Sequence, residues 1–216
     1  MPAKMLRPDI PHALQAVQDI GGLIQTDELL SGLLLEGVDG SDVRGKGVEI
    51  IESRFTKCTL SQAAIEKFQL RDCILDGCDL TAGSFPNASW HVIEILNSRC
   101  SGLQLQMGML KNVLFKNCKL DLANLRFARL ENVAFIDCVI TDIDFYNAQL
   151  KNVAFTRSAL EGVTFSGSTL KNVDLSGSPI VSINGIQSLK GASISQEQLM
   201  QLAPYFAREI GITVKE

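Results

Sequence analysis

An apolar residue recurs at every fifth position from Ile50 to Ile180, which gives 27 consecutive matches without one insertion. Neither regular structure repeats at this interval, because a helix returns to the same side every 3.6 residues and a strand every two. A second series lies two residues before the first and holds mostly small or β-branched residues, such as Ala123, Val133 and Cys138. Two inward residues in five, one large and one small, predict short extended segments joined by tight turns.

A longer period of twenty residues overlies the period of five. The segments KNVLF, ENVAF, KNVAF and KNVDL begin at positions 111, 131, 151 and 171. Four extended segments with roughly right-angled turns close a square, so twenty residues make one coil. Coils should stack at the inter-strand spacing of about 4.8 Å, and this stacking places Phe115, Phe135 and Phe155 in one column. The chain is therefore predicted to be an all-β solenoid.

The repeats resemble those of the pentapeptide-repeat family, whose loose motif is a small residue, Asp or Asn, Leu or Phe, and two variable residues. The segments ANLRF at 123–127 and VDLSG at 173–177 match this motif, and the resemblance covers roughly residues 33–180. At the Asp/Asn position this chain often has another residue, as at Ala134, Val139, Ala154 and Ala159. The resemblance implies a right-handed quadrilateral β-helix of about seven 20-residue coils.

Both ends depart from the repeat, and we expect them to cap a solenoid whose open edges would otherwise recruit other chains. Residues 1–30 are predicted to form an N-terminal cap, residues 31–185 the β-helix and residues 186–216 a C-terminal helical cap. Leu14, Val17 and Ile20 stand at helical spacing in the first cap. Glycine replaces the large inner residue at positions 40 and 45, so the first coil should be imperfect.

A capping-box signature marks the start of the C-terminal helix, with Ser195 followed by Gln198 three residues later. Pro204 should kink or divide this helix, since proline cannot donate its backbone hydrogen bond. Its apolar face should cover the last coil or, alternatively, contact a second copy in a homodimer. That face comprises Leu199, Leu202, Phe206 and Ile210.

Close packing predicts a compensation inside the square between Trp90 and Cys100. Trp90 stands where other coils have Leu or Ile, and Cys100, ten residues on and thus across the square, replaces the usual large residue. The other cysteines also follow the inner grid. Four of them share one small-residue column with serines, so buried reduced thiols are favoured over disulfides or a metal site; this column comprises Cys58, Cys78, Ser98, Cys118, Cys138, Ser158 and Ser178.

The chain offers little for catalysis or for nucleic acid. His12 and His91 lie far apart in the predicted fold, and the glycine clusters lack the Lys-Ser/Thr ending of a phosphate loop. Residues 50–180 contain 13 acidic and 13 basic residues, which leaves no basic footprint for direct nucleic-acid binding. With no apolar run of about 18 residues, we expect a cytoplasmic protein without a membrane segment. We predict no catalytic residues, no cofactor and no metal.

The outward positions predict two columns of interest. Asn112, Asn132, Asn152 and Asn172 should form an amide ladder that stabilises the turns. A strip on one wall is unexpectedly apolar and is the candidate partner surface. It comprises Ile74, Leu96, Leu114, Ala134, Ile136 and Ala154.

These observations favour a non-catalytic scaffold for protein–protein interaction, with a protein partner whose identity the sequence does not define. A homodimer could form through the C-terminal helix or through the apolar wall. The family resemblance implies an alternative, a DNA-mimicking modulator or protector of a type II topoisomerase such as gyrase. That mechanism needs a strongly negative wall, whereas the repeats here are balanced in charge. A gyrase supercoiling assay separates the two hypotheses.

Overall fold

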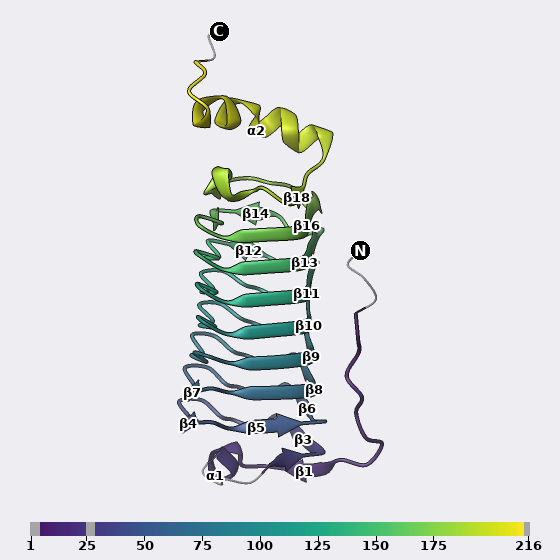
Figure 1. The fold of residues 1–216 in the computed structure, drawn as a ribbon. Helices are drawn as coiled ribbons and strands as arrows, with labels where there is room; N and C mark the ends of the chain where they lie inside the picture. Colours follow the sequence, from purple (N-terminus) through teal and green to yellow (C-terminus); the bar gives the residue numbers. More distant parts are fainter. Residues whose placement is uncertain (1–4, 25–28, 214–216) are drawn as a thin grey trace.

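The computed structural model describes residues 5–24 and 29–213, and the chain forms a β-solenoid of about nine turns with a helix at its C-terminal end (Figure 1). The predicted solenoid is confirmed and is taller than the seven coils expected. The elements in chain order are β1 (Gln15–Val17), α1 (Ile20–Ile24), β2 (Leu30–Ser31), β3 (Leu33–Glu36), β4 (Arg44–Lys46), β5 (Glu49–Ile51), β6 (Arg54–Thr56), β7 (Ala64–Glu66), β8 (Gln69–Asp76), β9 (Ser89–Leu96), β10 (Met109–Lys116), β11 (Arg129–Ile136), β12 (Ile140–Thr141), β13 (Gln149–Thr156), β14 (Leu160–Glu161), β15 (Val163–Thr164), β16 (Thr169–Gly177), β17 (Ile183–Asn184), the 3-10 helix η1 (Ile186–Ser188), β18 (Ala192–Ser193) and α2 (Gln196–Glu209).

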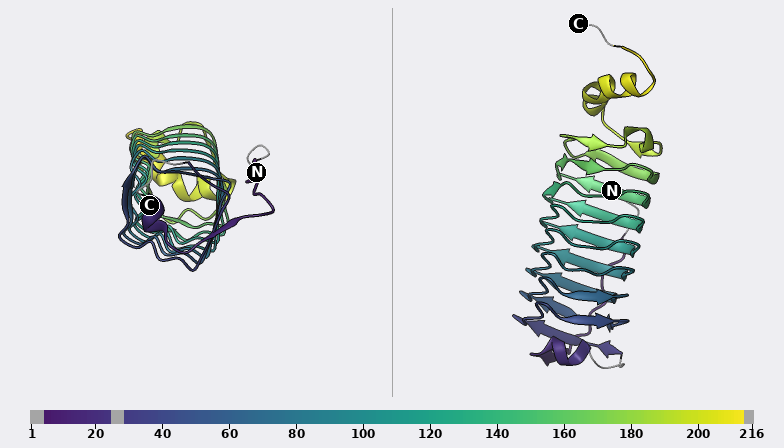
Figure 2. Two further views of the ribbon diagram at one scale, coloured as in Figure 1. Left: turned by 90° about the horizontal axis from the view of Figure 1, so that it is seen from below. Right: turned by 90° about the vertical axis from the view of Figure 1, so that its left-hand side faces the viewer.

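The strands pair in parallel with a register of twenty residues. Leu110 pairs with Leu130 and Phe115 with Phe135 between β10 and β11, and the same offset continues to β13. Viewed along the axis, the coils superpose on one four-sided outline (Figure 2). The Phe135 ring stacks between those of Phe115 and Phe155, with centroids 5.1 and 4.8 Å away. The predicted column of phenylalanines is therefore confirmed.

The corners of the square depend on a backbone conformation that L-residues usually avoid. Every fifth residue from Gly32 to Asn172 has a positive φ, between 50° and 71°. Asn, Asp and Gly tolerate this left-handed region best, and they occupy many of these positions. Leu122 and Phe127 also adopt it, with φ values of 56° and 59°. The tight turns were predicted from the period of five, and this dihedral is what closes them.

The predicted asparagine ladder is present at one corner. The side-chain amide of Asn172 donates to Asn152 Oδ1 (2.9 Å), Asn152 donates to Asn132 (2.9 Å), and Asn132 donates to Asn112 (3.3 Å). One coil below Asn112 the column continues with Val92, which cannot extend the ladder. The ladder therefore supports the upper coils, where it links four successive turns.

The small inner column does more than leave space for large neighbours. The S–H group of Cys58 donates to the carbonyl oxygen of Leu35 (3.3 Å), and Cys138 donates to that of Phe115 (3.5 Å). Ser158 makes the equivalent bond to Phe135 (3.4 Å) and also accepts the backbone N–H of Cys138 (2.9 Å). All six cysteines are free and buried. Trp90 and Cys100 are both buried, and their contact across the square stays a prediction.

The N-terminal cap differs from the predicted helix around Leu14, Val17 and Ile20. Residues 15–17 form β1, which pairs with β3, because the first coil exposes backbone groups that an added strand can satisfy. The helix α1 begins only at Ile20, where the Asp19 carboxylate accepts the N–H of Gly21 (2.8 Å). The predicted cap also includes residues 1–4 and 25–28, which lie outside the described residues.

The helix α1 explains why glycine interrupts the grid at positions 40 and 45. A Cβ atom at Gly40 would lie 2.6 Å from Cγ2 of Ile20, and one at Gly45 would lie 2.5 Å from Cγ2 of Ile24. The two isoleucines are buried and fill the interior of the first coil in place of its own large side chains. The glycines of the first coil thus leave the space that the two isoleucines of α1 fill.

The C-terminal cap confirms the predicted capping box and corrects the predicted face. The Ser195 hydroxyl accepts the N–H of Gln198 (3.1 Å), and Gln198 Oε1 accepts the N–H of Ser195 (2.7 Å). The helix α2 passes through Pro204 without dividing. Of the four apolar residues expected to cover the last coil, Leu202 is buried and Phe206 half-buried, whereas Leu199 and Ile210 are exposed. The helix lies above the last coil on a narrow contact (Figure 1).

Candidate interaction surfaces

The interior of the rod is filled by side chains, so any site must lie on a wall, at a corner or at an end. The stacked Phe, Leu and Ile residues of successive coils are almost all buried, including Phe85, Phe145 and Phe165. Cavities of about 290 and 450 Å³ lie between the last coil and α2. They exist because α2 contacts the rod mainly through Gln198, Leu202 and Phe206.

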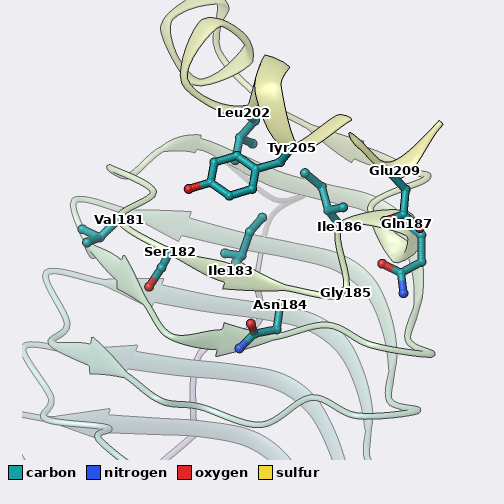
Figure 3. A pocket seen from close by; sticks show the side chains of 10 residues that line it. All are labelled: Val181, Ser182, Ile183, Asn184, Gly185, Ile186, Gln187, Leu202, Tyr205 and Glu209. Carbon is teal, nitrogen blue, oxygen red and sulfur yellow. The ribbon is translucent and has the colours of Figure 1, made fainter. Parts of the chain in front are cut away.

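The smaller cavity beside α2 is lined by both apolar and polar side chains (Figure 3). Its lining comprises Val181, Ser182, Ile183, Asn184, Gly185, Ile186, Gln187, Leu202, Tyr205 and Glu209. The Tyr205 ring lies over Ile183, and the only carboxylate, that of Glu209, lies at the opposite end from the Ser182 hydroxyl (Figure 3). This arrangement pairs no nucleophile with a base. The cavity is therefore a notch of mixed polarity at the end of the rod, without a catalytic arrangement.

The described residues contain no group of three His, Cys, Asp or Glu side chains that could hold a metal ion. Burial raises the pKa of the Cys73 thiol to about 12, so this thiol stays protonated at neutral pH. The pKa of Cys138 is also raised, first by its hydrogen bond with Cys118 and then by burial. Protonated, buried thiols are poor nucleophiles and poor metal ligands. This chemistry fits the structural role given above.

The six residues of the predicted apolar strip do lie on one wall, in two adjacent columns. The first column runs Ile74, Glu94, Leu114, Ala134 and Ala154 across β8 to β13. The second runs from Leu96 to Ile136 with Lys116 between them. Ala134 and Ala154 are buried, and the four larger residues are half-buried. The strip is thus real in position, but charged residues interrupt it and it exposes less apolar surface than the sequence indicated.

A second apolar cluster was only partly recognised from the sequence. Phe127 and Met107 occupy one corner in adjacent coils, and Met109 follows on the next wall. All three are exposed. The Phe127 ring contacts Tyr146 edge-on (centroids 5.7 Å apart), and the Arg126 guanidinium lies 4.7 Å from the centre of the Tyr146 ring. The period of five placed Met107 and Phe127 at turns, but it carried no signal for their joint exposure.

No helix in residues 5–24 and 29–213 combines the length and apolarity that a membrane crossing requires. The N-terminal segment instead runs along the outside of the rod (Figure 1). The backbone N–H of Asp9 donates to the carboxylate of Asp72 (3.4 Å), which is the corner residue of β8. In the same column as Asp72, Val92 and Asn112 are buried, whereas Asn172 higher in the column is exposed.

Comparison with solved structures finds other pentapeptide-repeat proteins. QnrB1, described as a plasmid-mediated fluoroquinolone resistance protein, is 23% identical and aligns over 93% of this chain and 97% of its own, with a TM-score of 0.33. HetL from the cyanobacterium Nostoc, described as involved in heterocyst differentiation regulation, is 18% identical over 88% and 92%, with a TM-score of 0.44. Rfr23 from the cyanobacterium Cyanothece is 15% identical over 66% and 91%, with a TM-score of 0.21.

No curated protein sequence matches the chain. The family model for the pentapeptide repeat region does match, over residues 48–125 and 108–184. These two matches together span most of the solenoid, from β5 to β17, and their overlap falls in the central coils. The twenty-residue register and the left-handed corners occur throughout the same stretch. The chain therefore belongs to the pentapeptide-repeat family.

Proposed function

We propose that the protein is a non-catalytic scaffold that binds a protein partner through the outer surface of its rod. The observation that carries this proposal is that the rod interior is filled by stacked side chains, while a continuous 12-stranded sheet faces outward along the rod. The described titratable groups form no nucleophile–base pair in the cavity beside α2. Six free cysteines fit a reducing compartment, and we propose the cytoplasm as its location.

The apolar strip is the first surface we assign to this partner. Leu114 lies between Glu94 and Ala134 in one column, and Leu96 lies between Asp76 and Lys116 in the next. Half-buried leucines framed by charged residues suit an interface with an apolar centre and a polar rim. A flat parallel sheet also presents these side chains at fixed spacing, so the surface needs no rearrangement before binding.

Charge-introducing variants test this surface. We expect Leu114→Lys and Leu96→Glu to reduce co-purification of the partner from the native host by about tenfold or more, since interface anchors often contribute about 2 kcal/mol or more. Each new charge faces an opposite charge one coil away, at Glu94 and Lys116 respectively, which should preserve folding. Thr169→Lys, at an exposed position before the corner at Asn172, serves as the control. Equal recovery of the partner by all variants would refute this surface.

We further propose that α2 mediates a homodimer. Leu199, Met200, Tyr205 and Ile210 are exposed on a helix that already covers the last coil with other residues. Sedimentation should show a dimer for the wild type and a monomer for Leu199→Glu combined with Met200→Glu, because each carboxylate would be buried unpaired at the interface. Glu197→Lys, a charge change on the same helix, should leave the dimer intact. A monomeric wild type at high concentration would contradict this proposal.

The alternative of a gyrase modulator lacks support from the charge distribution. One column contains Lys111, Glu131, Lys151 and Lys171 in four successive coils. Lys151 pairs with the Glu131 carboxylate (2.7 Å). A DNA-like surface would require acidic columns instead. The repeat region is balanced in charge, which favours a partner that recognises shape and local side chains.

A further inference from the structure

Exposed large apolar side chains of residues 50–180 are confined to two adjacent coils. They are Met107, Met109, Leu122, Phe127 and Val139. The rest of this stretch, all of it described by the structure, keeps its large apolar residues at least half-buried. A scatter of single exposed residues is ordinary. The exposed apolar side chains are instead confined to two adjacent coils of a rod built from equivalent coils, which indicates a function specific to those coils.

Three of these residues meet at one corner together with an arginine and a tyrosine. Met107, Met109, Arg126, Phe127 and Tyr146 are called the Met–Phe corner below. Backbone bonds hold its layers in place, since Met107 N–H donates to Arg126 O (2.9 Å) and Phe127 N–H to Tyr146 O (2.9 Å). The aromatic contact and the cation–π contact described above fix Tyr146 and Arg126. Methionine, aromatic residues and arginine are the residues enriched at the centres of protein interfaces.

The fold itself does not favour these residues at this corner. Met107 and Phe127 both have a φ of 59°, in the left-handed region that penalises side chains other than Gly, Asn and Asp. Other coils place Asn87, Asn147 and Gly167 at the same corner. The chain therefore accepts backbone strain and exposed apolar surface together at this corner in two successive coils, and at one further corner residue, Leu122. Strain retained at an exposed site is a pointer to function, and large exposed apolar groups point to a binding surface.

Charge defines the kind of partner. Arg126 has Asp144 as an ion-pair partner at 3.7 Å, and Glu131 is occupied by Lys151. Arg129 lies beside Met109 on the adjacent strand, and Lys111 follows Met109 by two residues. Among the described residues no carboxylate lies within ion-pair distance of Arg129 or Lys111. Glu131 stands opposite Lys111 in the strand register and is ion-paired with Lys151, so one carboxylate faces three cations on this flank of the Met–Phe corner. The flank therefore carries a net positive charge, which favours an anionic ligand.

We propose that the Met–Phe corner is a docking site for an acidic segment of a protein partner that carries apolar anchors. An anchor side chain contacts Met107 and Phe127, whose flexible thioether and flat ring accommodate different shapes. Carboxylates flanking the anchor pair with Arg129 and Lys111. The site lies before the corner at Asn112 and the apolar strip lies after it, so the two surfaces share β10, whereas α2 lies at the end of the rod.

Two fluorescein-labelled peptides of equal length test the proposal by fluorescence anisotropy on the full-length protein. Both carry the same Leu and Phe residues, and they differ in having either Asp and Glu or Lys at the remaining charged positions. We expect the acidic peptide to bind and the basic peptide to bind at least about tenfold more weakly. Binding of the acidic peptide should weaken as salt is raised, because the cations are exposed.

Variants at the corner separate binding from folding. Phe127→Asn and Met107→Asn introduce the residue used at Asn87 and Asn147, so thermal unfolding should occur at the wild-type temperature or above it. Each should weaken binding of the acidic peptide by about tenfold or more. Arg129→Gln combined with Lys111→Gln should remove most of the salt dependence. Lys67→Asn, at the same corner two coils below Met107, should change neither the binding of the acidic peptide nor its salt dependence.

Three results would overturn the proposal. Equal binding of acidic and basic peptides would remove the charge selectivity, and unchanged binding by folded Phe127→Asn would remove the apolar anchor. Sedimentation supplies the third: conversion of a wild-type dimer to a monomer by Phe127→Asn would identify the occupant as a second copy of this chain. Loss of dimerisation by the α2 variants alone concerns the homodimer and leaves the docking site in place.

Discussion

Replacement of Phe135 by alanine is expected to lower the free energy of unfolding by about 3–5 kcal/mol. Phe135 is completely buried, and its ring lies between two parallel rings at 5.1 and 4.8 Å, with Phe145 meeting it edge-on at 6.4 Å. The neighbouring rings are fixed to their own coils by the sheet, so they cannot move along the axis to fill the space. The transfer term and the cavity term therefore both apply in full.

Urea denaturation monitored by circular dichroism measures this loss as a lower midpoint concentration of urea. The slope of the unfolding free energy against urea concentration is compared between variants. Phe127→Ala is the matched control, because it removes the same atoms from an exposed corner and should cost less than about 1 kcal/mol. Equal losses at the two positions would contradict the stacked core. A changed slope for Phe135→Ala would indicate that the coils above and below the cavity unfold separately.

Replacement of Gln198 by leucine is expected to destabilise the packing of α2 on the last coil by about 2–3 kcal/mol. Residue 198 stands twenty positions after Ser178, where a further coil would place its small inner residue. Its side-chain amide donates to the carbonyl oxygens of Leu175 (2.9 Å) and Ser178 (2.6 Å). The bond to Leu175 repeats the one that Cys138 makes to Phe115, so α2 satisfies the last coil as another coil would.

Hydrogen exchange reports this effect better than global unfolding, since the end of a solenoid can open locally. Amides of α2 and of the last coil should exchange faster in Gln198→Leu, whereas those of β10 and β11 should be unaffected. Gln201→Leu makes the same replacement at an exposed position of the same helix and should leave protection unchanged. Unaltered protection in Gln198→Leu would show that Leu202 and Phe206 suffice to hold the helix.

The repeat region was predictable because its period appears in every coil. Twenty-seven apolar matches leave one arrangement in which large and small residues both face inward, and the parallel register follows from it. The left-handed corners had a signal too, in the recurrence of Asn, Asp and Gly two residues after each large residue. That signal was weak because residues such as Leu122 and Phe127 also occupy these corners.

The two ends were less predictable because single contacts decide them. Helical spacing at Leu14, Val17 and Ile20 was wrong as a guide, since pairing with β3 outweighed local periodicity. On α2 the apolar periodicity identified Leu202 and Phe206 on the covering side but not Gln198, which contacts the last coil through its hydrogen bonds. A polar residue in that role could not be anticipated without knowing where the last coil ends.

The candidate surfaces divide in the same way. The alternation within a strand assigned Leu96 and Leu114 to the outside correctly, yet it could not give their exposure, which depends on Glu94, Lys116 and other neighbours from adjacent coils. The Met–Phe corner required both the stacking order and the unpaired cations beside it. Side-chain pairing between coils, such as that of Lys151 with Glu131, decides which charges remain available.

The twenty-residue register of the coils from β2 to β13 has a consequence for changes in chain length. Deleting twenty residues removes one coil and keeps each remaining side chain in its own column, so the Asn and Phe columns become shorter. Deleting five residues preserves the apolar interior, because the period of five continues. The coils after the deletion, however, are rotated by one side of the square relative to the coils before it. The asparagines would then stack on a different corner, and charged side chains that now pair between adjacent coils would lose their partners.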